Sequence, residues 1–284
     1  MIAGLLGRCT FPSPGTATTC AVSGGADSLA LLVLAAEAGT QVTAVHVDHG
    51  LRPGSADEAQ VVAEVAGRWG AAFRSEAVAV AAGPNLEARA RRARYDVLPA
   101  DVLTGHTADD QAETVLLNLV RGAGLDGLRG FDPRRRPIAA LRRHETLAVC
   151  AELGLHPVRD PSNDDPRFRR NRIRHEALPL LDAIAERDVV AVLAGQSGHL
   201  RADAQLLDDL AATIDPTDAG ALASAPEPLA ARAVRRWLRT GAEGHPPDAA
   251  TVARVLEVAR GEAVACEIAG GRRVSRHQQR MVVH

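Results

Sequence analysis

Apolar runs typical of strands alternate with helical patterns over the first 120 residues of the chain. Such alternation predicts a parallel sheet wrapped by helices. The predicted fold class is therefore α/β, a doubly wound, Rossmann-like parallel sheet. We expect strands over residues 18–22, 41–47, 72–80 and 102–105, and helices over residues 27–38, 55–69, 86–98 and 108–120.

A second pattern follows residue 183. Leucines and valines recur at helical spacing over 188–214, and Asp215-Pro216 ends that helix. Helices near 228–240 and 248–259, followed by strand-like runs at 264–268 and 280–283, predict a small C-terminal α(+β) domain. We therefore divide the chain into a catalytic domain (1–184), a helical linker (185–215) and a C-terminal domain (216–284).

The segment Ser23-Gly-Gly-Ala-Asp-Ser28 ends the first strand and opens the first helix. A turn of this kind presents backbone N–H groups and a helix N-terminus to an anion, and its glycines let phosphates approach the backbone. The chain contains no lysine, which excludes the GxxxxGK[ST] nucleotide loop. The alternative is a plain connector between a strand and a helix.

Polar residues follow three of the predicted strands, at 23–28, 48–52 and 105–113. The carboxyl ends of parallel strands share one edge of the sheet, where ligands bind. Asp110 and Glu113 are spaced i, i+3 and share a helix face that could hold Mg²⁺ or an ammonium group. The alternative is helix capping, with Thr107 as N-cap and Asp109 or Asp110 in the first turn.

Histidines and arginines add weaker candidates. His46 is expected to be packed within its strand, whereas His49 and His106 leave strand ends and could contact phosphate or nucleoside. All 33 basic residues are arginine, and they gather at 89–94, 129–143, 167–174 and 272–280. Each cluster fits either phosphate binding or a solvated face, and the net charge of −2 does not by itself predict a nucleic-acid partner.

Composition narrows the class of protein. Aromatic residues make up 2% of the chain, so the core must consist of Ala, Val and Leu. Four scattered cysteines without a CxxC pair favour neither a metal site nor a disulfide framework. No apolar run approaches the roughly 20 residues of a membrane span. We expect a soluble, cytoplasmic protein without a membrane partner; the oligomeric state stays open, a homodimer included.

Five segments resemble, in their order, the tRNA(Ile)-lysidine synthetase family of the PP-loop ATP pyrophosphatases. The resemblance covers about residues 18–182, and its last segment is not expected in pyrophosphatases at large. The segments are Ser23–Ser28, His46–Arg52, Asn85–Glu87 with Ala90–Tyr95, Gly105–Thr114, and Arg159–Asn163 with Phe168–His175.

The resemblance implies a ligase that forms a carbon–nitrogen bond on an isoleucine tRNA with a CAU anticodon. The 2-carbonyl oxygen of the wobble cytidine attacks the α-phosphate of ATP and releases pyrophosphate. The ε-amine of free L-lysine then attacks the ring carbon, AMP leaves, and lysidine remains. The tRNA changes from methionine to isoleucine specificity.

The resemblance also implies residue roles. The ATP-binding set is Ser23, Gly24, Gly25, Ala26, Asp27, Ser28, Asp48, His49, Gly105 and His106. Mg²⁺ would bind Asp27 and Asp110, and lysine would bind Asp110 and Glu113; Arg91 and Arg94 join Asp27, Asp110 and Glu113 as the catalytic set. The tRNA-binding set is Arg169, Arg170, Asn171, Arg172, Arg174 and His175. The alternatives are a basic helix face for Arg91 and Arg94, and ion pairs with Asp160, Asp164 and Asp165 for the arginines of 167–174.

In the family, residues after the catalytic domain help to hold the tRNA, and we expect this chain to be a shorter version without a further C-terminal domain. Arg272, Arg273, Arg276 and Arg280 are candidates, and a packed terminal hairpin with one wet face is the alternative. Three competing functions stay open. A tRNA thiolase should carry CxxC pairs or a catalytic cysteine. A nucleotide synthetase should lack the segments near 160–175. A non-catalytic nucleotide- or RNA-binding protein would not use Asp110 and Glu113.

Overall fold

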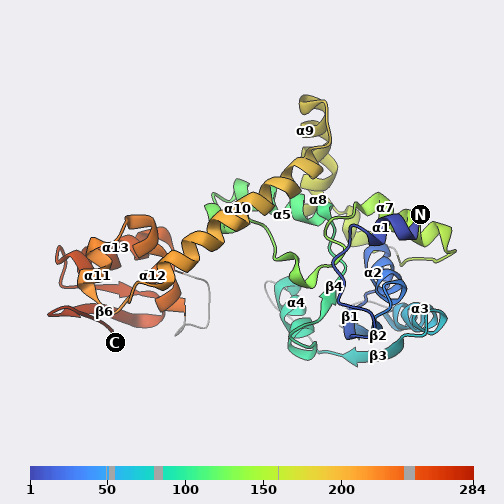
Figure 1. Ribbon diagram of the computed structural model, residues 1–284, viewed down its shortest axis with the longest axis horizontal. Coiled ribbons are helices and arrows are strands. Elements are labelled where there is room, and N and C mark those ends of the chain that lie inside the picture. The colour runs from blue at the N-terminus through green and yellow to red at the C-terminus, as the bar shows by residue number, and fades with distance from the viewer. Residues whose placement is uncertain (49, 51–54, 80–85, 159, 240–246) are drawn as a thin grey trace. The chain divides into compact units, whose positions relative to one another are not determined.

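The computed structural model describes residues 1–48, 50, 55–79, 86–158, 160–239 and 247–284, with only the backbone at 55–57, 86–88, 91 and 163. These residues form two compact units, 1–198 and 199–284 (Figure 1). The division falls within helix α10 (Val189–Ala212). The finer boundaries at 184 and 215 stay a prediction.

The first unit is built on a parallel sheet. Its described strands are β1 (Ala17–Ala21), β2 (Gln41–Asp48), β3 (Ala72–Ala77) and β4 (Leu103–Thr104), in the order β3-β2-β1-β4. The predicted strands are confirmed, but two are shorter than expected. Strand β3 ends at Ala77 because its last partner, Asp48, is the last residue of β2, and β4 pairs with β1 over two residues.

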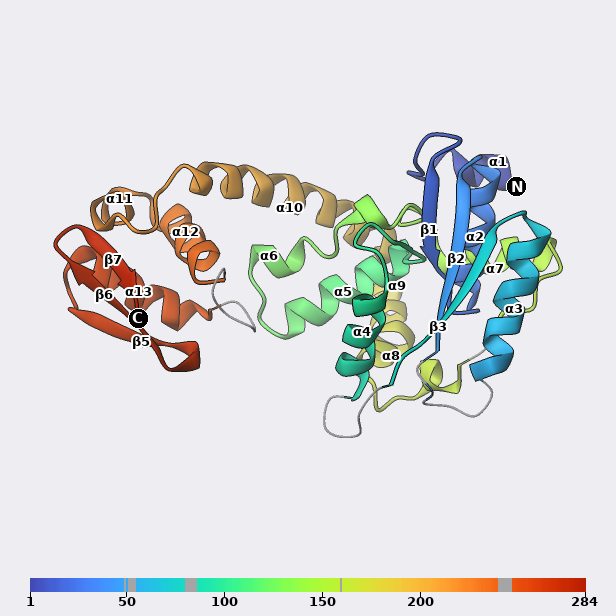
Figure 2. The ribbon, with the colours of Figure 1, turned by 90° about the horizontal axis from the view of Figure 1, so that it is seen from below.

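Helices cover both faces of this sheet. Helices α2 (Ala26–Glu37) and α3 (Ser55–Arg68) lie on one face, and α4 (Leu86–Val97) lies on the other (Figure 2). The apolar α2 packs against the sheet and against α7 (Arg143–Glu152), so that Leu29, Leu31, Leu32 and Leu34 are fully buried. The doubly wound architecture predicted from the alternating pattern is confirmed.

The strand order places a switch point between β1 and β4, where ligands bind in doubly wound sheets. Two glycines allow the turns there. Gly24 adopts the left-handed conformation with φ of +83°. A Cβ added to Gly105 would lie 2.7 Å from the carbonyl oxygen of Asp27, so the turn after β4 passes directly against the start of α2.

Helix α5 (Ala108–Val120) leads away from that turn and has the predicted bounds. The arginine-rich segment after residue 166 is helical from Arg169 onward. The other described elements of the first unit are α1 (Ile2–Leu6), α6 (Leu125–Leu128), 3₁₀ turns at Pro133–Arg135 and Pro161–Asp164, α8 (Arg169–Arg172), a π-helical turn at Ile173–Ala177, and α9 (Leu178–Ala185).

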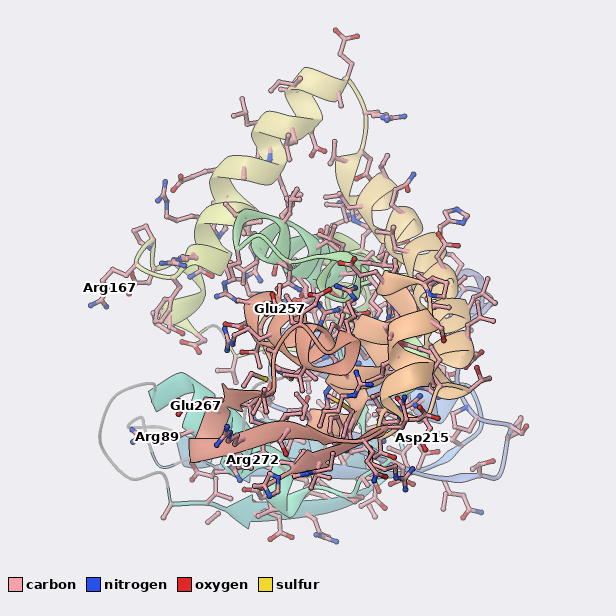
Figure 3. The ribbon with its side chains drawn as sticks, turned by 90° about the vertical axis from the view of Figure 1, so that its left-hand side faces the viewer. Arg89, Arg167, Asp215, Glu257, Glu267 and Arg272 are labelled. Carbon is pink, nitrogen blue, oxygen red and sulfur yellow. The ribbon has the colours of Figure 1, made fainter. Side chains whose placement is uncertain are left out.

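The second unit is the predicted α(+β) domain. Helices α11 (Ala219–Ser224), α12 (Glu227–Arg239) and α13 (Ala249–Arg260) precede an antiparallel sheet of β5 (Ala265–Ile268), β6 (Arg272–His277) and β7 (Arg280–Val283), with a 3₁₀ turn at Ala269–Gly271. Figure 3 looks onto this unit and labels Glu267 and Arg272 near the β5–β6 turn. Across the described ranges, no helix combines the length and apolar character needed to cross a membrane.

Candidate functional site

The Ser23–Ser28 loop connects β1 to α2 and is braced from within. The Ser28 hydroxyl accepts a hydrogen bond from the Ser23 backbone N–H at 3.1 Å and donates one to the Gly25 carbonyl at 2.9 Å. Within the described part of the chain, no side chain caps the start of α2. The first-turn N–H groups of that helix therefore suit an anion.

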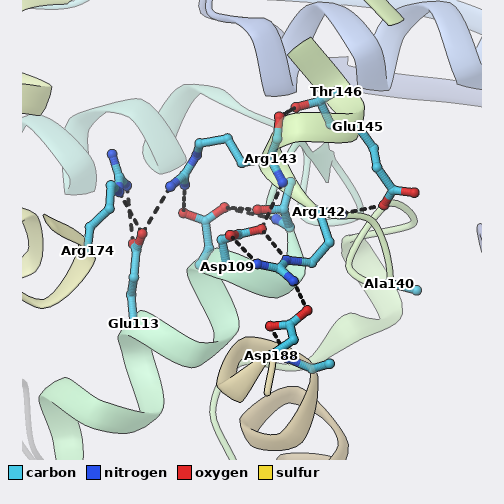
Figure 4. Close-up of polar contacts among 12 residues, drawn as sticks. Asp109, Glu113, Ala140, Arg142, Arg143, Glu145, Thr146, Arg174 and Asp188 are labelled. Atoms are coloured by element: carbon cyan, nitrogen blue, oxygen red, sulfur yellow. Dashed lines mark hydrogen bonds and ion pairs between the residues drawn. The ribbon is translucent and has the colours of Figure 1, made fainter. Parts of the chain in front are cut away.

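Three predicted carboxylates meet at this loop, and one arginine contacts all of them. Figure 4 shows the bond from this arginine, Arg143, to one of them, Glu113. Arg143, the first residue of α7, donates from Nη1 to Glu113 at 3.0 Å, from Nη2 to Asp110 at 2.9 Å and from Nε to Asp27 at 3.4 Å. The structure thus joins the start of α2, which follows β1, with α5, as the convergence of strand ends predicts.

Two more arginines complete the group. Arg170 donates to Glu113 at 2.6 Å and to Asp110 at 3.0 Å, and Arg174 donates to Glu113 at 2.7 and 3.2 Å. The Glu113 side chain is fully buried. The "carboxylate cluster" of Asp27, Asp110, Glu113, Arg143, Arg170 and Arg174 therefore balances three negative charges with three positive ones.

Burial and ion pairing act differently on the two aspartates. Burial raises the pKa of Asp27, an effect that the Arg143 guanidinium and the Thr146 hydroxyl oppose in part. Burial also acts on Asp110, but there the Arg143 and Arg170 guanidinium groups outweigh it, and the pKa of Asp110 falls below its ordinary value. Asp110 is thus the more firmly ionised of the two.

A second set of ion pairs fixes the backbone next to the cluster. Asp109 accepts from the Arg143 backbone N–H at 2.8 Å and from Arg142 Nε at 3.1 Å. Arg142 also binds Asp188, which precedes α10. The predicted cap at the start of α5 is present as well, because the Thr107 N–H donates to Asp110 at 2.9 Å. Asp110 therefore both caps the helix and belongs to the cluster.

The predicted tRNA-binding set divides into two groups. Arg169, Arg172 and His175 are exposed; Arg172 pairs with Glu176 at 2.9 Å and His175 lies 3.7 Å from Asp164. The other three point inward: Arg170 and Arg174 to the cluster, and Asn171 to the carbonyls of Ser162 and Asp165 at 2.7 and 2.9 Å. For Arg170 and Arg174 the suggested acidic partners at 160, 164 and 165 are wrong, since α5 supplies their partners. For Arg167 the suggestion is confirmed, because Arg167 pairs with Asp165 at 2.6 Å.

The other predicted site residues lie outside the carboxylate cluster. Asp48 ends β2 and accepts from the Gly50 N–H at 2.8 Å. His106 bonds the Thr104 hydroxyl at 2.8 Å, and His46 is buried, as expected, with Nδ1 3.0 Å from the Val22 carbonyl.

Arg94 is half-buried on α4 and is not among the described partners of the three carboxylates. His49 and the Arg91 side chain lie outside the described residues.

The sequence reasoning missed Arg143 and Thr146. Both lie on α7, which no pattern predicted, although Arg143 is the last residue of the arginine cluster at 129–143. Thr146 donates its hydroxyl to Asp27. Nothing in the sequence distinguishes Arg143 from the other arginines of that cluster, so the fold was needed to find it.

The donor set fits a magnesium ion bound together with a nucleotide. The described residues contain no group of three or more His, Cys, Asp or Glu side chains that could hold a metal alone. Mg²⁺, however, typically takes one or two carboxylates together with substrate phosphates. Asp27 and Asp110, which face the same guanidinium beside the phosphate loop, meet that requirement.

A cysteine also lies near the loop. Cys150 Sγ is 3.6 Å from the Ala26 carbonyl oxygen. Burial, reinforced by the negative charge of Asp27, raises the pKa of this thiol to about 11. Because the thiolate is the nucleophile, this shift disfavours Cys150 as a nucleophile at neutral pH.

Comparison with known proteins covers both units. Residues 6–181 match the family model of the PP-loop domain, and residues 218–282 match that of the TilS substrate binding domain. A solved structure, the U34-tRNA thiolase NcsA from Methanococcus maripaludis, aligns with a TM-score of 0.55 over 70% of this chain and 76% of that one. At 16% identity this likeness shows the fold alone.

Two relatives found by sequence are more similar to this chain than that solved structure is. The tRNA(Ile)-lysidine synthase of Rhodococcus erythropolis is 44% identical over 238 residues, covering 78% of this chain and 73% of the relative. The enzyme of the same name from Nocardia farcinica is 43% identical over 255 residues, covering 84% of this chain and 80% of the relative. With both units matched and this identity across most of each sequence, the chain belongs to the tRNA(Ile)-lysidine synthase family.

Proposed function

We propose that the protein ligates L-lysine to the wobble cytidine of a CAU-anticodon isoleucine tRNA at the expense of ATP. The 2-carbonyl oxygen of the cytosine attacks the α-phosphate and pyrophosphate leaves. The neutral ε-amine of lysine then attacks C2 of the ring and expels AMP. The convergence of Asp27, Asp110 and Glu113 on one guanidinium beside the phosphate loop is the observation that carries this proposal.

The phosphate loop and its surroundings would bind the nucleotide. The N–H groups at the start of α2 and the turn at Gly24 suit the phosphates. Mg²⁺, held by Asp27 and Asp110, would neutralise phosphate charge and so ease attack at phosphorus. The exposed Ser23 hydroxyl is a further donor, whereas the Ser28 hydroxyl braces the loop. Asp48, Gly105 and His106 border the site from the ends of β2 and β4.

Asp110 and Glu113 would hold the ε-ammonium group of lysine. Asp110 is a poor proton acceptor, because the guanidinium groups around it lower its pKa. Its chemistry therefore favours orienting the ammonium over removing a proton. The amine must still lose its proton before it attacks, and the role of base is left to a group nearer the reacting carbon.

The tRNA would be bound through exposed arginines of both units. On the first unit these are Arg169 and Arg172, with His175 beside them. On the second unit Arg273 and Arg280 are exposed on β6 and β7. Arginine suits such a role because its planar fork matches phosphate oxygens. We propose that the reaction takes place in the cytoplasm.

The competing functions fit less well. A thiolase needs a reactive cysteine, and Cys150, whose pKa is about 11, does not supply one. A binding protein without catalysis has no functional need for a completely buried Glu113, since burying a charge is costly even when it is paired. Both observations favour the ligase.

The test is incorporation of radiolabelled L-lysine into acid-insoluble RNA. The purified protein is incubated with ATP, Mg²⁺ and a transcript of the CAU-anticodon isoleucine tRNA. We expect incorporation that requires ATP and is lost when the wobble cytidine is replaced by uridine. Pyrophosphate release without incorporation would contradict lysine as the nucleophile, and the absence of both would contradict the ligase.

A further inference from the structure

The carboxylates of Asp110 and Glu113 already accept all the hydrogen bonds that they can hold. Each carboxylate has about four acceptor sites. Glu113 receives four bonds from Arg143, Arg170 and Arg174. Asp110 receives four from Arg143, Arg170 and Thr107. Neither a metal ion nor an ammonium group can join these two residues without displacing a donor.

Arg143 is the donor whose displacement would free acceptor positions on the largest number of carboxylates. Among the described residues it alone contacts Asp27, Asp110 and Glu113 together, with one nitrogen on each. Arg170 reaches only Asp110 and Glu113 of the three, and Arg174 reaches only Glu113. Removing the Arg143 guanidinium would open one acceptor position on each carboxylate.

The surroundings permit that movement. The Arg143 backbone is fixed by its N–H bond to Asp109, so a movement of the side chain need not disturb α7. The Arg143 side chain is 23% exposed, whereas that of Glu113 is fully buried. Its bond to Asp27, the carboxylate within the Ser23–Ser28 loop, is the longest of its three at 3.4 Å. A guanidinium at this place can turn from carboxylate to phosphate, since its fork fits both.

We propose that Arg143 is a positioning residue that acts as an exchangeable counter-ion: it occupies the carboxylates in the free protein and leaves them for the phosphates when magnesium–nucleotide binds. This rests on the proposed function, because it concerns the same nucleotide and lysine sites. One consequence is an order of binding. Lysine, whose ε-ammonium needs the positions freed on Asp110 and Glu113, binds after the nucleotide.

The test uses Arg143→Met, which keeps the length of the side chain and removes its charge. Mn²⁺ binding without nucleotide is followed by the electron paramagnetic resonance signal of free Mn²⁺, and ATP binding in EDTA is followed by calorimetry. We expect Mn²⁺ to bind at least about tenfold more tightly than to the wild type, and ATP without metal about tenfold more weakly, since one charge at contact distance is worth that much. A merely structural role would weaken both.

Arg74→Met is the matched control, because Arg74 is paired with Glu76 at 2.6 Å on β3, away from the cluster. Neither affinity should change in it. If Arg143→Met does not fold, Arg143→Lys replaces it, with smaller changes of the same two signs. Affinities that fall together, or that match the wild type, overturn the proposal. Because neither measurement uses tRNA or lysine, that outcome is independent of whether the wild type makes lysidine.

Discussion

A fully buried carboxylate in contact with three guanidinium groups is the most constrained residue of the site. Glu113 receives hydrogen bonds from Arg143, Arg170 and Arg174. A buried charge is tolerated only when it is paired and hydrogen-bonded, and removing one partner leaves the others uncompensated. Glu113 therefore serves stability and chemistry together, and a substitution must separate the two.

Glu113→Gln keeps the shape of the side chain and removes its charge. We expect loss of lysine incorporation by about two orders of magnitude or more, since the lysine ammonium loses its counter-charge. Stability should fall by about 3 kcal/mol, because three guanidinium groups lose a buried partner. Affinity for tRNA should change less than twofold. Incorporation, chemical denaturation and filter binding measure these three quantities.

The control for that substitution is Glu64→Gln, which changes an exposed carboxylate on α3 that accepts from Gln60. It should leave all three quantities unchanged. Full incorporation by Glu113→Gln would remove Glu113 from the lysine site and leave it a structural role only.

At the level of single residues, the sequence predicted the acidic residues of the site better than the basic ones. Asp27, Asp110 and Glu113 lie at predicted strand ends and helix starts, so the topology alone brings them together. Their roles in metal and lysine binding stay a prediction. The inward positions of Arg170 and Arg174 could not be foreseen, because an arginine looks the same in a sequence whether it faces tRNA or a buried glutamate.

At the scale of elements, the local sequence pattern was enough to predict the bounds of strands and helices that have one apolar face or a cap. Helix α5 and strand β7 have their predicted bounds, and β1 and β2 differ by one residue at their ends. Strand β6 was missed because Arg272–His277 has a single apolar residue, Val274, which packs fully buried between β5 and β7.

The start of α7 matters because it carries Arg143, and Glu145 holds it in place. Glu145 accepts from the Arg142 backbone N–H at 2.8 Å and from Arg8 at 2.6 and 3.0 Å. Burial alone would raise its pKa, but Arg8 and the Arg142 N–H outweigh that effect and lower the pKa of Glu145.

Glu145→Gln should therefore destabilise the protein in a pH-dependent way. A carboxyl with a lowered folded-state pKa contributes stability above its unfolded pKa, about 4.3, and loses it as the pH falls through the folded value. We expect a cost of about 1 kcal/mol at pH 7, as for a helix cap, that vanishes in acid. Urea denaturation of both proteins between pH 7 and 3 measures it, and a cost that persists unchanged at pH 3 would contradict the assignment.

Across the whole molecule, exposed arginines occur on both units although the net charge is −2. The net charge therefore gave no reason to expect a nucleic-acid partner. The arginine clusters along the sequence were the feature compatible with one. The fold class was predictable at this scale because alternating elements restrict the topology. The oligomeric state was not predictable, since nothing in the sequence pattern of one chain indicates how many copies associate.

Replacing Arg273 and Arg280 together with alanine should weaken tRNA binding about tenfold and lower the slope of log affinity against log salt by about two, since each arginine neutralises one phosphate. Arg169→Ala with Arg172→Ala should do the same on the first unit. Filter binding at several salt concentrations measures both, and Arg74→Ala is the control. An unchanged slope in either pair would assign those arginines to the solvated surface.

The carboxylate cluster contains as many guanidinium groups as carboxylates, and this balance affects how the protein meets a charged partner in solution. Opposite charges packed within a few ångströms cancel at a distance, and beyond about 8 Å salt screens what is left. An approaching polyanion is therefore neither attracted nor repelled by the cluster. Collision rates are governed by the arginines on the surface, and the interior charges act only after docking.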